Sequence, residues 1–151
     1  YSNLNKSNVN FSHFLDKIIV KYFDPESRIK VSGMFPSVQI NIDPIKVDIA
    51  IKNIIDNAFK YSFPKTTISI SSNINNDFIK ILVHNFGEPI SKENLNKIKT
   101  PFYRINKDSS VKGFGLGLAI TNKILLAHNG ALSIKSSKEE GSLFTLSLPL
   151  K

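Results

Sequence analysis

The sequence predicts an α+β fold, a two-layer α/β sandwich in which a largely antiparallel mixed sheet carries about three helices on one face. Apolar residues recur at helical spacing in three separate segments of the 151-residue chain. Between these segments lie short stretches in which apolar and polar residues alternate, as in half-buried strands. No internal repeat, low-complexity tract or second domain is apparent, and the length is that of one ordinary domain.

The N-terminal part is expected to form a helix, two short strands and a second helix. These elements are predicted at residues 9–23, 28–33, 37–42 and 44–61. Asp24-Pro25 ends the first helix, because the residue before a proline disfavours helical backbone. Asp43 and Pro44 are typical of the N-cap and first residue of the second helix, which reaches about Tyr61.

The C-terminal part is expected to form two strands, a short helix from Ser91, a loop, a third helix and a final hairpin. The strands are predicted at residues 66–72, 78–85, 131–137 and 142–148, and the third helix at 116–128. Residues 73–77 and 139–141 are rich in turn formers, and Asn129-Gly130 is typical of a helix C-cap. Residues 100–115 lose all periodicity, so a mobile loop is expected there.

The composition excludes several classes of function. The chain contains no cysteine, which rules out disulfides, zinc–thiolate sites and cysteine nucleophiles. No apolar run approaches the ~18–20 residues that cross a bilayer, and no signal peptide opens the chain. A soluble domain in a reducing compartment, with no direct membrane contact, is therefore expected. His13, His84 and His128 lie far apart in the sequence, and the last two are expected to be structural.

The net charge of +8 does not indicate a nucleic-acid partner. Of the 20 basic residues only Arg28 and Arg104 are arginines, whereas guanidinium groups are the preferred readers of phosphate and guanine edges. The lysines are also scattered and form no basic stripe. We therefore expect no nucleic-acid binding.

The second predicted helix carries a polar stripe beside its apolar face. Asn53, Asn57 and Lys60 are spaced i, i+4 and i+7, which places them in one row. Asparagine is a poor helix former, so two of them within a helix suggest amides that face a metal ion, its waters or a phosphate. The alternative is chance, because asparagine is abundant throughout this chain.

Three further segments are candidates for ligand contact. The glycine-rich run 113–118 enters a helix, where free N–H groups favour an anion, although it matches neither a dinucleotide fingerprint nor a P-loop. Asn85, at a strand end before Gly87, could face the exocyclic amine of a base. Residues 101–104 could anchor a lid, with the Arg104 fork on a phosphate. The alternatives are a flexible loop, a plain turn and an ordinary surface arginine.

In order and spacing, these segments resemble the N, G1, F and G2 boxes of the catalytic ATP-binding domain of bacterial sensor histidine kinases. That family has the Bergerat (GHKL ATPase-like) fold, shared with gyrase, heat-shock chaperone and mismatch-repair ATPases. The matching segments are 53–61, 85–90, 101–104 and 113–118, with 141–144 and 148–149 resembling the closing strand motif. The likeness covers residues 9 to 150.

The resemblance implies cofactors, ATP and Mg²⁺, and a role for each matching residue. Asn57 would coordinate Mg²⁺, and Asn53, Lys60 and Arg104 would act on the phosphates as catalytic residues. Tyr61 would stack near the adenine, whose amine would donate to Asn85. The full nucleotide-binding set would comprise Asn53, Asn57, Lys60, Tyr61, Asn85, Gly87, Ile90, Phe102, Gly113, Gly115, Leu116, Gly117 and Leu118.

Three positions depart from relatives in informative ways. Asn85 stands where the G1 box usually has Asp, and its amide can still accept a hydrogen bond from an amine. Phe114 stands where the G2 box commonly has a small residue. Asn53 stands where hydrolysing relatives have a glutamate that activates water, so ATP should be bound without rapid hydrolysis.

The resemblance therefore implies a protein-histidine kinase domain that donates the γ-phosphoryl group to a histidine on a separate dimerisation domain. Residues 1–8 would be a remnant of the linker to that domain, residues 9–151 the catalytic domain, and the chain alone would not label itself. The parent would be a homodimeric inner-membrane sensor kinase that signals to a response regulator from the cytoplasm. The alternatives are an anti-sigma-factor type serine kinase, a gyrase-like or chaperone-like clamp, and a degenerate docking module.

Overall fold

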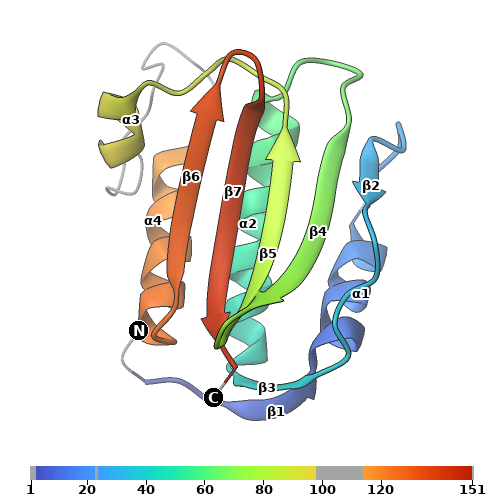
Figure 1. Cartoon of the computed structure of the whole chain (residues 1–151), viewed down its shortest axis with the longest axis vertical. Coiled ribbons are helices and arrows are strands. Elements are labelled where there is room, and N and C mark those ends of the chain that lie inside the picture. The colour runs from blue at the N-terminus through green and yellow to red at the C-terminus, as the bar shows by residue number, and fades with distance from the viewer. Residues whose placement is uncertain (1–2, 23, 98–113, 151) are drawn as a thin grey trace.

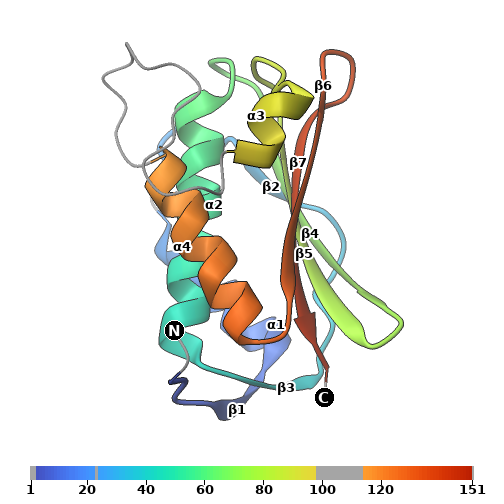
Figure 2. The ribbon, with the colours of Figure 1, turned by 90° about the vertical axis from the view of Figure 1, so that its left-hand side faces the viewer.

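The computed structural model describes residues 3–22, 24–97 and 114–150. Its helices are α1 (Phe11–Lys21), α2 (Pro44–Tyr61), α3 (Lys92–Lys97) and α4 (Phe114–Ala127). Its strands are β1 (Ser7–Asn10), β2 (Ile29–Val31), β3 (Gln39–Ile42), β4 (Ile68–Asn75), β5 (Phe78–Asn85), β6 (Ala131–Ser137) and β7 (Gly141–Pro149). Helices α1, α2 and α4 lie on one face of the main sheet (Figures 1 and 2).

The main sheet has five strands in the order β2-β4-β5-β7-β6. β2 runs parallel to β4, and the other neighbouring pairs are antiparallel. β1 and β3 form a separate antiparallel ribbon at the end of the molecule where the N- and C-termini lie (Figure 1). The predicted α+β class, with a largely antiparallel mixed sheet and helices on one face, is confirmed.

The core lies between this sheet and the helices. Along β5 every second residue is buried against them, in the order Ile79, Ile81, Val83 and Asn85. The first three are apolar and the last is an amide, so the hydrophobic layer ends in a polar group at the end of the strand. α2 packs on α4 and buries one face of apolar residues that includes Ile51, Ile54 and Ile55.

Several boundaries differ from those predicted. β1 was not predicted, because Ser7–Asn10 is short and mostly polar and depends on β3 for its hydrogen bonds. α1 consequently begins at Phe11 rather than residue 9, with the Asn10 side chain accepting from the His13 N–H at 3.0 Å. β4 extends to Asn75, so the turn before β5 is shorter than expected. α4 begins at Phe114, and residues 100–113 of the predicted loop lie outside the described residues.

Asp43 and His128 join three parts of the fold. The Asp43 carboxylate caps α2 by accepting from the Lys46 N–H at 3.2 Å, and it also accepts from the Asn5 N–H at 2.9 Å. The Asp43 N–H donates to Nε2 of buried His128 at 3.0 Å, and His128 Nδ1 lies 2.8 Å from the Ile124 carbonyl. Nε2 must therefore be the acceptor and Nδ1–H the donor of a neutral ring. His128 is structural, as predicted.

The Asp43 carboxyl group predicts a loss of stability in acid. Burial raises its pKa, but the Asn5 and Lys46 backbone N–H groups outweigh this, and the net pKa is below 3.8. A lowered folded-state pKa contributes stability that is complete above the unfolded-state pKa and is lost as the pH falls through the folded-state pKa. In urea unfolding, wild type should be more stable than Asp43→Asn at pH 6, and the difference should shrink below about pH 4. A difference independent of pH would contradict this role.

Candidate functional site

Three polar side chains line up across the ends of three strands. Asn85 of β5 lies directly opposite Ser142 of β7, and Ser142 lies directly opposite Ser136 of β6. The two serine Oγ atoms are 2.8 Å apart, and the Ile90 N–H donates to Ser136 Oγ at 2.8 Å. Asn85 and Ser142 are 4% and 3% exposed. This row, which we call the polar ladder (Asn85, Ser142 and Ser136), fixes the segment after β5 against the sheet.

The two serines of the polar ladder were missed in the sequence. Ser142 belongs to the closing motif Gly141-Ser142-Leu143-Phe144, which indicated a strand but no ligand contact. Only the strand register places Ser142 beside Asn85 and adds Ser136 from β6. Ile90, which was predicted, is buried and tied to the ladder through its backbone.

The segment after β5 also docks on the end of α2. Gly87 and Ser62 form an antiparallel bridge, and the Phe63 N–H donates to the Phe86 carbonyl at 2.7 Å. Tyr61 ends α2 and packs partly buried against the core. The predicted Tyr61 and Gly87 are thus brought together, although they are 26 positions apart in the chain.

A substitution at Gly87 tests this docking. A Cβ at position 87 would lie 2.4 Å from the Tyr61 carbonyl oxygen, a backbone atom that cannot move without the end of α2. Gly87→Ala should therefore displace the segment and lower the free energy of unfolding by about 1–3 kcal/mol. Gly33→Ala is a useful contrast, because its added methyl group meets no atom within 4 Å, although its positive φ carries backbone strain. Equal stability of Gly87→Ala and wild type in urea would contradict the close approach.

Asn57 is a buried amide without a complete set of partners. It is 5% exposed on α2, and in the described part of the chain its Nδ2 has no hydrogen-bond partner. Oδ1 of Asp48, nearer the N-terminus of α2, is likewise a buried atom with no hydrogen-bond partner in the described part of the chain. An unsatisfied buried polar group costs about 1–3 kcal/mol, so its retention needs an explanation. The unpartnered Nδ2–H group can donate to a phosphate oxygen. The carbonyl oxygen of an asparagine is, in general, a suitable ligand for a hard cation.

Asn53 connects the polar stripe of α2 to the glycine-rich segment. Its Nδ2 donates to the Gly117 carbonyl at 3.4 Å. Gly117 lies in the first turns of α4, as do Gly115 and Leu116, and Leu118 is fully buried in the core. The N-box and G2-box residues therefore meet where α2 and α4 pack together. Phe102, Arg104 and Gly113 lie outside the described residues.

Lys60 lies on the side of α2 that faces the end of α1. It is exposed and lines a cavity of about 220 Å³ together with Asp56, Phe59 and Tyr22. The rings of Tyr22 and Phe59 stack with their centroids 5.5 Å apart. Partial burial raises the pKa of Asp56, and the nearby Lys60 ammonium opposes this shift. Lys60 is thus the accessible cation of the polar stripe.

Arg28 is a structural residue that the sequence left unassigned. Its Nε donates to the Thr66 carbonyl at 2.9 Å, and its guanidinium group also donates to the Phe63 carbonyl at 3.1 Å. The guanidinium carbon lies 5.5 Å from the centre of the Phe59 ring. These contacts hold the segment that leaves α2 and so support the docking of Gly87.

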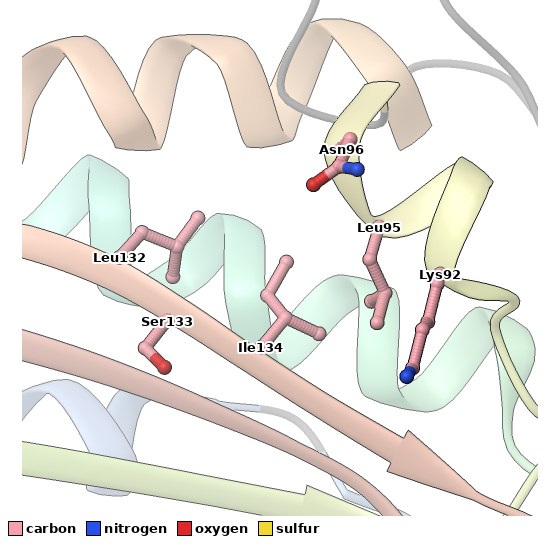
Figure 3. Close-up of a pocket in the computed structure, with 6 residues that line it drawn as sticks. All are labelled: Lys92, Leu95, Asn96, Leu132, Ser133 and Ile134. Atoms are coloured by element: carbon pink, nitrogen blue, oxygen red, sulfur yellow. The ribbon is translucent and has the colours of Figure 1, made fainter.

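A larger cavity lies between α3 and β6 (Figure 3). Its volume is about 420 Å³, and it is lined by Lys92, Leu95, Asn96, Leu132, Ser133 and Ile134. Leu132 and Ile134 point from β6 toward the helices, and Leu95 extends toward them from α3 (Figure 3). None of the predicted site residues lines this cavity, but Ile134 precedes Ser136 of the polar ladder on the same face of β6. This cavity, with its mixed polar and apolar lining, therefore adjoins the ladder.

The chemistry of the site is that of amides and hydroxyls. Among residues 3–22, 24–97 and 114–150, no group of three or more His, Cys, Asp or Glu side chains could hold a metal ion. The helices in the same residue ranges also include none with the length and apolarity to span a bilayer.

Comparisons with known proteins point to one family. Residues 42–151 match the family model of histidine kinase-, DNA gyrase B- and HSP90-like ATPases. The chain is 36% identical over 112 residues to the sensor protein RprX of Bacteroides fragilis, covering 72% of the chain and 22% of RprX. It is 32% identical over 155 residues to the sensor histidine kinase WalK of Bacillus subtilis, covering 97% of the chain and 25% of WalK. It thus spans about a quarter of the length of these relatives.

Solved structures have the same fold. The mycobacterial sensor histidine kinase MprB superposes with a TM-score of 0.78 at 24% identity, over 95% of this chain and 96% of that one. Full-length ShkA in complex with AMPPNP superposes with a TM-score of 0.81 at 20% identity, over 97% of this chain and 31% of that one. With the family match, these findings show that the chain belongs to the histidine kinase-, DNA gyrase B- and HSP90-like ATPases, as an ATP-binding catalytic domain of the histidine kinase type.

Proposed function

We propose that this domain binds Mg²⁺·ATP and donates the γ-phosphoryl group to a histidine on a separate dimerisation domain. The observation that carries the proposal is the buried Asn57 amide, whose Nδ2 has no partner in the described part of the chain. Asn57 would hold Mg²⁺ or a phosphate oxygen, the Asn85 amide would accept from the adenine amine, and Gly87 would help to shape the pocket for the base.

The remaining polar residues of α2 would position the phosphates. Asn53, already tied to Gly117, would orient the phosphate chain near the start of α4, and the exposed Lys60 would neutralise charge on it. When bound, Mg²⁺ supplies further charge neutralisation on the phosphate oxygens. Arg104 is proposed to approach the γ-phosphate, and Phe102 to close over the nucleotide.

The choice of acceptor follows from Asn53. An amide cannot take a proton from water at neutral pH, so this side chain would not promote hydrolysis as a general base does. Transfer to a histidine needs no base on α2, because a neutral imidazole nitrogen is itself the nucleophile. The bond between the γ-phosphorus and the bridging oxygen breaks, a phosphorus–nitrogen bond forms, and ADP leaves.

The proposed setting is a two-component system. The dimerisation domain of a homodimeric, membrane-anchored parent kinase would present the histidine, and a response regulator would receive the phosphoryl group in the cytoplasm. Residues 1–8 would lead to the dimerisation domain. Within them, Ser7 and Asn8 already pair with β3, and the Asn5 N–H binds Asp43, so this connection would enter the domain at the start of α2.

Incubation with ATP labelled on the γ-phosphate tests this proposal. The domain alone should remain unlabelled, whereas addition of the parent's dimerisation domain should give label on that partner, stable to base and labile to acid. Omission of Mg²⁺ or the Asn57→Ala substitution should remove the label. Acid-stable label on a partner serine would instead indicate a serine kinase, and label on the isolated domain would contradict a separate acceptor.

A further inference from the structure

We propose that the base pocket of this domain accepts 6-oxopurine nucleotides, such as inosine triphosphate, as well as ATP. The inference rests on the proposed function, in which Asn85 faces the edge of the base. It follows from the hydrogen-bonding character of the polar ladder, whose three side chains each contain both a donor and an acceptor.

The Asn85 amide can meet either kind of purine. Its oxygen accepts from the 6-amino group of adenine, and its NH₂ donates to the 6-carbonyl of hypoxanthine or guanine. Rotation about the terminal side-chain torsion exchanges these two ends without moving the backbone. A carboxylate at this position could only accept, so it would offer no donor to the 6-carbonyl oxygen and would repel it.

The burial of Asn85 increases the cost of a mismatch between this side chain and the base. Asn85 is 4% exposed, so little water is available to repair a mismatch between the reader and the base. Sites with buried polar readers discriminate strongly against ligands that leave those readers unpaired. An amide can pair with the 6-substituent of either class of purine, whereas a carboxylate can pair with the 6-amino group but not with the 6-carbonyl oxygen.

The neighbouring hydroxyls do not fix the direction of the Asn85 amide. Ser142 lies opposite Asn85 and is bonded to Ser136 at 2.8 Å, where either hydroxyl can be the donor. Ser136 already accepts from the Ile90 N–H, which leaves it one proton to give and one lone pair to offer. The Ser136–Ser142 hydrogen bond can therefore run in either direction, so these hydroxyls impose no single orientation on the amide of the neighbouring strand.

Calorimetric titration of the domain with a non-hydrolysable ATP analogue and with inosine triphosphate, each with Mg²⁺, tests this inference. Wild type should bind the two within about tenfold of each other. Asn85→Asp should retain the ATP analogue and bind inosine triphosphate at least roughly tenfold more weakly than wild type does, as expected for loss of a paired contact to a base. Asn73→Asp, an exposed residue of β4, is the matched control and should change neither affinity.

The outcomes separate this inference from the function on which it rests. Binding of the ATP analogue with clearly more than tenfold discrimination against inosine triphosphate in wild type would overturn the inference and leave the proposed function standing. Binding of neither nucleotide would overturn both. The wild-type comparison decides the matter even if the Asn85→Asp protein fails to fold, and thermal unfolding of that variant reports on this directly.

Discussion

Asn57→Ala is expected to weaken Mg²⁺-dependent binding of ATP by roughly tenfold to a hundredfold while leaving the domain folded. Hydrogen bonds to charged groups contribute about 1.5–3 kcal/mol, and a buried amide that meets a phosphate or its metal ion falls in this class. Stability should change little, because the substitution also removes an Nδ2 that is buried without a partner in the described part of the chain. Asn57→Ala should therefore lower the affinity for ATP with little effect on stability, whereas truncation of a packing residue would lower the stability with little effect on affinity.

The measurement is a pair of titrations with a non-hydrolysable ATP analogue, with and without Mg²⁺, together with urea unfolding of each protein. Asn73→Ala is the matched control, since it removes an exposed amide on β4. A loss of several kcal/mol in stability with unchanged affinity would show that Asn57 is a structural residue and would contradict its assignment to the ligand.

His128→Ala is expected to lower the free energy of unfolding by about 3–5 kcal/mol, as truncation of a buried ring commonly does. His128 is 3% exposed, and its ring joins the Asp43 N–H to the Ile124 carbonyl. Truncation leaves the donor at the start of α2 unpaired and opens a cavity at the end of α4. Both effects act on the same junction, which also holds the N-terminal segment through Asn5.

Urea unfolding at pH 7 measures this loss. His13→Ala is the control, because His13 is exposed on α1 and should contribute less than about 0.5 kcal/mol. A His128→Ala protein as stable as wild type would show that another group satisfies the Asp43 N–H. Nucleotide affinity should fall only in proportion to the unfolded fraction, since the ring of His128 binds Asp43 and Ile124, which are not among the proposed ligand-binding residues.

Much of the fold could be predicted because local chemistry determines it. Asp43 and Pro44 do cap and begin α2. Asn129 has a φ of 61° after the end of α4, and the Gly130 N–H donates to the Leu125 carbonyl at 2.7 Å, as a C-cap requires. β1 could not be predicted, because its polar sequence gains a strand conformation only by pairing with a distant segment.

The candidate site also contains residues that the sequence indicates and residues that only the fold brings together. Asn53 and Asn57 are marked by two amides at helical spacing, and Asn85 and Gly87 by a turn that ends a strand, so both segments could be found in the sequence. The hydroxyls of Ser136 and Ser142 could not, because their contact depends on the register of three strands. Arg28 escaped notice for a related reason, since its partners are carbonyl groups more than 30 positions away.

The most direct test of the central claim is a calorimetric titration of the wild-type domain with a non-hydrolysable ATP analogue, performed with and without Mg²⁺. We predict saturable binding of one nucleotide per chain that requires Mg²⁺ for full affinity, because in the proposed function Mg²⁺ neutralises charge on the phosphate oxygens beside Asn57. Absence of binding under both conditions would contradict the account and would leave the chain a docking module that has kept only the fold.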